Sequence, residues 1–168
     1  MALLFALLLT IANTAFGKGV YQTGPDFIAE SFGESTPEAK SLWLTPELKE
    51  TGKKIMGKRI RGIRERYWAH EGKTVWIMEE IGKERPITIG VVVNDHQIER
   101  IKILAFRESR GWEVRYPAFT AQYDNVKITP DLKLDQHIDG ITGATLSVRA
   151  VTKVARLSLF YHQQTLDQ

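Results

Sequence analysis

The sequence predicts an α+β fold, in which a C-terminal helix packs on an antiparallel sheet and short helices precede that sheet. Three features carry this prediction: two pairs of alternating segments, an apolar helical repeat near the end of the chain, and two short helical segments near its start. A length of 168 residues suits one globular domain. We therefore expect residues 18–168 to form a single domain with an N-terminal helical extension, after a leader of residues 1–17.

The leader, MALLFALLLTIANTAFG, is apolar from Ala2 to Ala12 and ends in small residues before Lys18. The apolar stretch is too short to cross a bilayer comfortably, and Ala15 and Gly17 suit the small positions of a cleavage site. The segment predicts a secretory signal peptide and a periplasmic or cell-envelope location. An uncleaved leader would instead anchor the protein to the membrane, and a buried N-terminal helix is the remaining alternative.

Two short helices are expected after the leader, in TGPDFIAESFG and TPELKETGKKIMG. In the second, Thr45 is a suitable N-cap, Pro46 suits the first helical position, and Glu47 complements the positive end of the helix dipole. We expect both helices at the periphery of the domain.

Four strands are expected from two hairpin patterns. RERYWAH and TVWIMEE lie on either side of Glu71 and Gly72, and ITIGVVV and IERIKILAF flank Asn94 and Asp95. Alternating segments joined by such turn residues are typical of β-hairpins. The sequence therefore predicts an antiparallel sheet of at least four strands.

The remaining elements follow the sheet. GWEVRYPAFTAQY is expected to begin extended, to stop at Pro117 and to hold a helical turn through Tyr123, and NVKITPDLKLD is expected to be an edge strand broken by Pro130. Residues 145–163 are expected to form the closing helix. Its single buried stripe is predicted from apolar residues at helical spacing, namely Val148, Val151, Ala155 and Leu159.

The composition excludes several classes of chemistry. The chain has no cysteine, which excludes thiol redox chemistry, disulfides, Fe–S clusters and Cys-ligated zinc. Its formal charge of +3 is small and basic residues alternate with acidic ones, so we expect no nucleic-acid binding. Asp135, His137 and Asp139 alternate as metal ligands can, but metal sites usually draw ligands from several segments, and we expect no metal. Redox chemistry would need a bound cofactor.

The segment DGITGAT, residues 139–145, forms a small turn in front of the closing helix. Gly140 and Gly143 permit backbone angles that other residues avoid and let another molecule approach the main chain. Thr145 stands at the helix start, where free N–H groups and the helix dipole favour an anion. The alternative is an ordinary helix-entry loop in which Thr142 or Thr145 is the N-cap.

These seven residues resemble the D-G-x-[ST]-G-A-T sequence of the FMN-binding domain family, and every fixed position matches. That family includes peripheral subunits of the sodium-translocating NADH:quinone oxidoreductase and of Rnf-type complexes, and small stand-alone exported proteins. The resemblance covers roughly residues 74–160. In it, the loop of residues 108–111, ESRG, departs from the E-T-P-G-L-G form of the large-complex subunits and is similar to the stand-alone members.

The resemblance implies that FMN is joined to Thr145 through a phosphoester, installed from FAD by a magnesium-dependent ApbE-type flavin transferase. We expect the phosphate to bind the N–H groups at the helix start. Asp139 is expected to shape the turn and to take part in recognition by the transferase. The residues expected around the bound cofactor in this segment are Asp139, Gly140, Thr142, Gly143, Ala144 and Leu146.

The loop of residues 108–111 supplies further candidates for cofactor contacts. We expect Glu108 to bond an N–H edge of the flavin, Arg110 to stabilise its reduced anion and Gly111 to admit the ring. A surface ion pair is the alternative for the two charged residues. Aromatic residues can stack on a flavin or pack in the core. Both roles stay open for the four candidates, Tyr67, Trp68, Trp76 and Trp112.

We expect an exported electron carrier that exchanges electrons with a membrane-bound electron donor or acceptor. The role of a carrier is favoured over that of an enzyme. A flavin reductase is the enzymatic alternative. A binding or regulatory module of the cell envelope, with the same fold and no covalent flavin, is the non-redox alternative. A nucleic-acid clamp over residues 140–143 conflicts with the leader and with the absence of basic residues in that loop.

Overall fold

The computed structural model describes residues 19–33 and 36–165, so the predicted leader lies outside the described residues. Its centre is a five-stranded antiparallel sheet in the order β1-β2-β3-β4-β5. The predicted α+β class is confirmed, and no helix in the described part of the chain has the length and apolarity to span a membrane. The strands are β1 (Ala39–Trp43), β2 (Arg64–His70), β3 (Lys73–Ile81), β4 (Pro86–Asn94) and β5 (Gln97–Phe106).

Both predicted hairpins are present. Glu71 and Gly72 connect β2 to β3, as expected, and both have positive φ angles of 46° and 79°. The β4–β5 turn lies one residue later than predicted, because Asn94 still pairs with Gln97. Its turn residues are Asp95 and His96, which have φ angles of 50° and 62°. Positive φ at both turn positions gives the backbone twist that a two-residue hairpin requires.

The strand β1 was not predicted. It pairs with β2 over its whole length, from Ala39 opposite Trp68 to Trp43 opposite Arg64. Only Leu42 among its residues is fully buried, so the segment lacks the alternation that identifies a half-buried strand. Its place in the sheet is therefore set by pairing with β2 and not by its own pattern.

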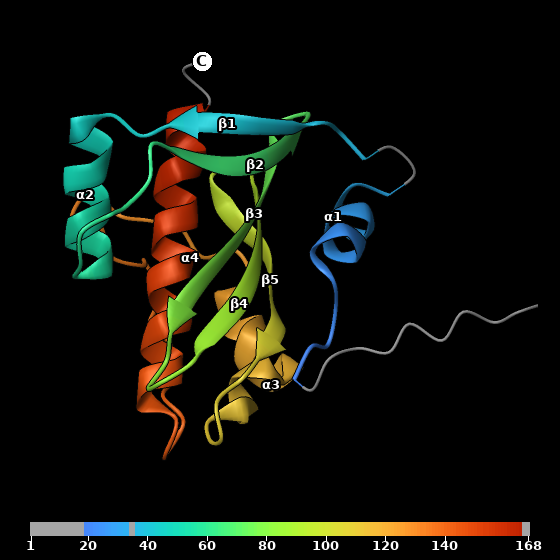
Figure 1. Ribbon diagram of the computed structural model, residues 1–168, viewed down its shortest axis with the longest axis vertical. Coiled ribbons are helices and arrows are strands. Elements are labelled where there is room, and N and C mark those ends of the chain that lie inside the picture. Colours follow the sequence, from blue (N-terminus) through green and yellow to red (C-terminus); the bar gives the residue numbers. More distant parts are fainter. Residues whose placement is uncertain (1–18, 34–35, 166–168) are drawn as a thin grey trace, which may run out of the picture.

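Helices cover both faces of the sheet (Figure 1). The long helix α4 (Thr145–Thr165) and its neighbour α2 (Pro46–Met56) lie on one face, and α1 (Gly24–Phe32) lies on the other. The predicted start of α2 is confirmed, since Thr45 Oγ1 accepts a hydrogen bond from the Leu48 N–H at 3.3 Å. Thr23 caps α1 in the same way, through the Asp26 N–H.

The closing helix α4 is confirmed, but its burial is wider than one stripe. Every residue from 157 to 162 is buried. The sheet covers one side of α4, α2 lies along another, and the segment after β5 covers a third, where Arg156 Nε donates to the Leu132 carbonyl at 2.5 Å. A helix enclosed on several sides needs apolar residues around most of its circumference.

Two predictions between β5 and α4 are wrong. Residues 112–115 form a 3₁₀ helix and are not extended, although the helical turn after them is present as α3 (Pro117–Thr120) and a 3₁₀ helix of residues 121–123. Residues 125–135 form no strand, because Asn125 and Leu132 have φ angles of 64° and 62°, which interrupt an extended chain. The segment makes isolated bridges only, such as Gln97 with Lys127.

Replacing Gly90 by alanine is expected to destabilise the fold by about 1–3 kcal/mol, because it overpacks the α1 face of the sheet. An added Cβ would lie 2.7 Å from each of two ring carbons of Phe27, which is fully buried between α1 and β4. Chemical denaturation measures the loss. Gly140→Ala is the matched control, since its Cβ would meet nothing within 4 Å, and equal losses in the two variants would contradict the packing argument.

Candidate functional site

The DGITGAT segment forms the turn that leads into α4, as predicted. Ala144 N–H donates to the Ile141 carbonyl at 2.9 Å, and Val148 N–H donates to the Ala144 carbonyl at 3.0 Å. Gly143 has a φ angle of 83°, in the left-handed region that favours glycine. The N–H groups of Thr145, Leu146 and Ser147 belong to the first turn of a 21-residue helix, where backbone donors have no partner inside the helix. The positive end of the helix dipole lies at the same place.

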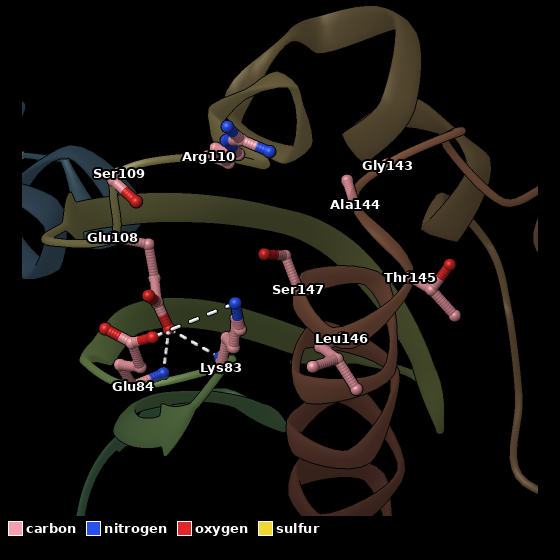
Figure 2. A pocket seen from close by; sticks show the side chains of 10 residues that line it. All are labelled: Lys83, Glu84, Glu108, Ser109, Arg110, Gly143, Ala144, Thr145, Leu146 and Ser147. Carbon is pink, nitrogen blue, oxygen red and sulfur yellow. Dashed lines mark hydrogen bonds and ion pairs between the residues drawn. The ribbon is translucent and has the colours of Figure 1, made fainter.

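A groove of about 540 Å³ lies beside this turn, between the start of α4, the loop after β5 and the turn between β3 and β4 (Figure 2). Its volume is in the range of small-molecule sites. Figure 2 shows Ser147 pointing from α4 toward the loop of Glu108, while Thr145 lies at the outer side of the first turn. The lining residues are Lys83, Glu84, Glu108, Ser109, Arg110, Gly143, Ala144, Thr145, Leu146 and Ser147.

Glu108 holds the β3–β4 turn in place. Its Oε1 atom accepts hydrogen bonds from three consecutive backbone N–H groups, those of Lys83 at 2.5 Å, Glu84 at 2.8 Å and Arg85 at 3.0 Å. Partial burial raises the pKa of Glu108, but the hydrogen bonds from Arg85, Glu84 and Lys83 outweigh it, so the pKa lies below its usual value. One carboxylate oxygen is therefore engaged by the protein itself, and Glu108 shapes the wall of the groove.

Arg110 and Gly111 take different places in the same loop. Arg110 is exposed and lines the groove, and within the described residues it forms no ion pair with Glu108 or another acid. Gly111 has a φ angle of 83°, and an added Cβ would lie 2.7 Å from Ser147 Oγ and 3.3 Å from Ala144 Cβ. Gly111 thus lets the loop pack directly on the first turn of α4, beneath the groove. Contact of either residue with a flavin stays a prediction.

Three residues of the predicted site shape the turn without lining the groove: Asp139, Gly140 and Thr142. Asp139 is exposed, and its N–H donates to Gln122 Oε1 at 2.7 Å. Its carboxylate lies 3.6 Å from the Nε2 atom of His137, which is also exposed. This position leaves the Asp139 side chain open to another protein, and its predicted recognition by a transferase remains a prediction.

The residues Asp135, His137 and Asp139 do not gather into a metal site. Asp135 Oδ1 accepts a hydrogen bond from the Lys127 N–H at 2.8 Å, which turns it toward its own loop. Within residues 19–33 and 36–165, no group of three or more His, Cys, Asp or Glu side chains has the arrangement of a metal site.

The aromatic candidates divide into core and surface. Tyr67 and Trp76 are cross-strand partners whose rings stack with centroids 4.9 Å apart, and both are buried on the α4 side of the sheet. Trp68 packs against the α1-side cluster. Trp112 is exposed and lines a second hollow that shares Glu108 with the groove. Trp112 is thus the member of the four that lies next to the candidate site.

Sequence reasoning did not single out four of the lining residues, Lys83, Glu84, Ser109 and Ser147. Ser147 is a polar residue in the first helical turn, two positions after Thr145, and this position could have indicated that it belongs to the site. In the structure its side chain is 4% exposed. The sequence around Lys83 and Glu84 contains no pattern that marks them as site residues. Their turn is held near the helix start by hydrogen bonds to Glu108, which lies 25 and 24 positions away. Ser109 lies in the loop of residues 108–111, in which cofactor contacts were expected only from its neighbours.

Removing the Glu108 carboxylate is expected to loosen the β3–β4 turn. Glu108→Ala leaves three N–H groups without their acceptor, and since the turn is exposed and water replaces part of the bonding, the loss is about 1 kcal/mol. Hydrogen exchange at the amides of Lys83, Glu84 and Arg85 should become faster. The matched control is Glu84→Ala in the same turn, whose carboxylate lies 3.8 Å from Lys83 Nζ and holds no backbone. Unchanged exchange in Glu108→Ala would refute this role.

The groove has the chemistry that a flavin mononucleotide requires. Backbone N–H groups at the helix start can donate hydrogen bonds to a phosphate, and Lys83 and Arg110 place positive charge at the same groove. Leu146 is 44% exposed and offers an apolar surface to a ring. Ser147, nearly buried and directed into the groove, adds a hydroxyl. The residues present therefore fit this cofactor.

Comparison with known proteins agrees with this assignment. Residues 82–159 match the model of the FMN-binding domain. That stretch runs from the β3–β4 turn into α4 and includes every residue that lines the groove. A search of curated proteins found no match to the chain. Residues 82–159 therefore match the FMN-binding domain family, which confirms the resemblance predicted from the sequence.

Proposed function

We propose that this protein is an exported electron carrier in which the phosphate of FMN is esterified to Thr145. The observation that carries the proposal is the position of Thr145, an exposed residue that borders the groove and is the first residue of α4. An exposed hydroxyl is accessible to a modifying enzyme. The adjacent N–H groups and positive helix end would hold the phosphate after attachment.

Attachment requires a second protein. An ApbE-type flavin transferase, with magnesium, would transfer the FMN moiety from FAD to Thr145 Oγ, so that a phosphoester bond forms and AMP leaves. The exposed turn of Asp139 and Gly140 supports such recognition, because its side chain and backbone face solvent beside the acceptor. The covalent bond would keep the cofactor on a protein outside the cytoplasm, where a dissociated flavin is lost by dilution.

The bound flavin supplies the capacity to accept one or two electrons, which a chain without cysteine otherwise lacks. The chain's own residues bind and orient the cofactor. The first turn of α4 holds the phosphate, while Lys83 and Arg110 balance the negative charge of the cofactor. Leu146 and the loop of Ser109 border the space left for the ring. The leader supports export to the periplasm or cell envelope, and we propose a membrane-bound electron donor or acceptor as the redox partner.

Intact mass of the denatured protein tests attachment. The chain is co-expressed with a matching transferase, purified and measured in denaturant, with a preparation from cells that lack the transferase as the reference. The proposal expects one added FMN moiety in the first preparation only, together with loss of the leader's mass if the signal peptide is cleaved. An unmodified chain in the first preparation would instead favour the envelope module without covalent flavin.

A further inference from the structure

Three exposed aromatic rings gather around one arginine. The Arg115 guanidinium lies 4.7 Å from the ring centroid of Tyr21, and 5.3 Å from those of Trp112 and Tyr116. The rings of Trp112 and Tyr116 contact each other edge to face, with centroids 5.3 Å apart. All three side chains are about two-fifths exposed, at 40%, 41% and 42%. We name these four residues the aromatic–arginine patch.

The patch borders the flavin groove. A hollow of about 640 Å³ is lined by Tyr21 and Trp112 and shares Glu84, Glu108 and Ser109 with the groove. The start of α4, the β3–β4 turn and α3 lie at the same end of the molecule (Figure 1). A protein that contacts the patch would therefore also cover the edge of the groove.

Unpaired positive charge surrounds this end of the protein. Among the described residues, Arg85, Arg110, Arg115 and Arg149 take part in no ion pair, and all four are exposed. They lie at the groove, at the hollow beside it, in the patch and in the first turns of α4. Three acids lie nearby: Glu108 accepts three backbone N–H groups, Glu84 lies 3.8 Å from Lys83, and Glu113 lies in the same 3₁₀ helix as Arg115. With Lys83, the four arginines give five basic residues against these three acids, so positive charge is in excess here.

The composition of the patch is that of an interface centre. Tryptophan, tyrosine and arginine dominate the binding energy of protein–protein contacts, because they bury large areas and offer directed bonds. Guanidinium groups pair most strongly with carboxylates, which they bind through two parallel hydrogen bonds. Contact with three rings restricts the Arg115 side chain, so that less side-chain entropy is lost when a partner binds.

We infer that the aromatic–arginine patch is the docking surface for a redox protein whose own contact surface is acidic. This inference rests on the proposed function for the identity of the partner as an electron-transfer protein. The patch contributes the contact area, and the arginines around it accelerate association through electrostatic attraction. Docking there brings the partner's redox centre to the open side of the groove.

Binding is tested first without the cofactor, on the flavin-free Thr145→Val chain, with the acidic blue-copper protein plastocyanin as the probe. We expect titration to shift the indole N–H resonance of Trp112, and rising ionic strength to reverse the shift. Arg115→Glu should weaken binding at least about tenfold at low salt, because an attraction becomes a repulsion. Arg64→Glu is the matched control, an exposed residue of β2, which lies at the far end of the sheet from the start of α4 (Figure 1).

Electron transfer is tested on the flavin-loaded protein by stopped flow. The reduced FMN anion gives up two electrons and one proton, so two Cu(II) centres of plastocyanin become Cu(I) for each flavin. The rate constant should fall with ionic strength and fall at least about tenfold in Arg115→Glu, while oxidation by neutral 1,4-benzoquinone is unchanged. A basic cytochrome c should react more slowly at low salt than at high salt.

The outcomes separate the two proposals. Equal weakening by Arg115→Glu and Arg64→Glu, or resonance shifts confined to other surfaces, would overturn the docking surface whatever the flavin does. Absence of flavin from the loaded preparation would overturn the proposed function, whereas the titration of the flavin-free chain would still report on the patch. Trp112→Ala gives a second reading, since it removes contact area without changing charge, and should weaken binding at both low and high salt.

Discussion

Thr145→Val is expected to yield a folded protein that carries no covalent flavin. Valine has nearly the shape of threonine but no hydroxyl, so the transferase has no oxygen to esterify. Thr145 is exposed, and the exchange of an exposed side chain at a helix start should change the free energy of unfolding by less than about 1 kcal/mol. Intact mass and visible absorbance of the denatured protein, after co-expression with the transferase, measure the loss.

Two variants sharpen this result. Thr145→Ser keeps the oxygen and should retain at least part of the modification. Thr142→Val removes the other exposed hydroxyl of the turn, which does not line the groove, and should leave the FMN mass in place. Flavin that persists in Thr145→Val and disappears in Thr142→Val would move the attachment to Thr142.

Acidification from pH 6.5 to pH 4 is expected to remove about 3 kcal/mol of stability through His162. This residue is 1% exposed, and its Nδ1 atom lies 2.8 Å from Thr74 Oγ1, which also accepts a hydrogen bond from Trp76 Nε1 at 2.9 Å. A neutral ring whose proton is on Nε2 can accept the Thr74 proton at Nδ1, whereas a protonated ring cannot. Burial, followed by the charge of His96, lowers the pKa of His162 from 6.5 to about 4.

The sign follows from proton binding. Between pH 6.5 and pH 4 the unfolded chain protonates this histidine while the folded protein does not, so the free energy of unfolding falls as the pH falls. The full loss is present below pH 4, where both states are protonated. A shift from 6.5 to about 4 corresponds to about 3 kcal/mol.

Urea denaturation at a series of pH values measures this loss. Because carboxylates titrate at the lower end of the same range, the informative quantity is the difference between the wild type and His162→Gln, which lacks the titrating ring. His70→Gln is the control, since His70 is exposed on β2. If His162→Gln loses as much stability between pH 6.5 and pH 4 as the wild type, the buried neutral histidine is not the cause.

Together the groove and the buried network divide the two ends of α4 by role. The first turn, with Thr145 and Leu146 exposed, faces solvent and the proposed cofactor. The last turns, around Tyr161 and His162, are enclosed by the sheet. A helix fixed at one end by burial presents its other end in a constant position, which suits a site that depends on the geometry of free N–H groups.

Local signals in the sequence determined much of the fold. Thr45, Pro46 and the turn at Glu71 and Gly72 act on neighbouring residues only, and their effects on α2 and the β2–β3 hairpin need no distant partner. The same holds for the DGITGAT turn, because Gly143 and the start of α4 are defined by adjacent peptide groups. The sequence also identified the family and the residue we propose for attachment.

Only the tertiary structure decided how that turn becomes a groove. Glu108 accepts from the N–H of Lys83, 25 residues earlier, and Gly111 leaves space for Ser147. Tyr21 contacts Arg115, which lies 94 residues later in the chain. The strand β1 and the irregular chain over residues 125–135 likewise depend on pairing with distant segments. Contacts between residues far apart leave no periodicity in the sequence, whereas caps, hairpin turns and helical repeats arise between near neighbours and can be recognised there.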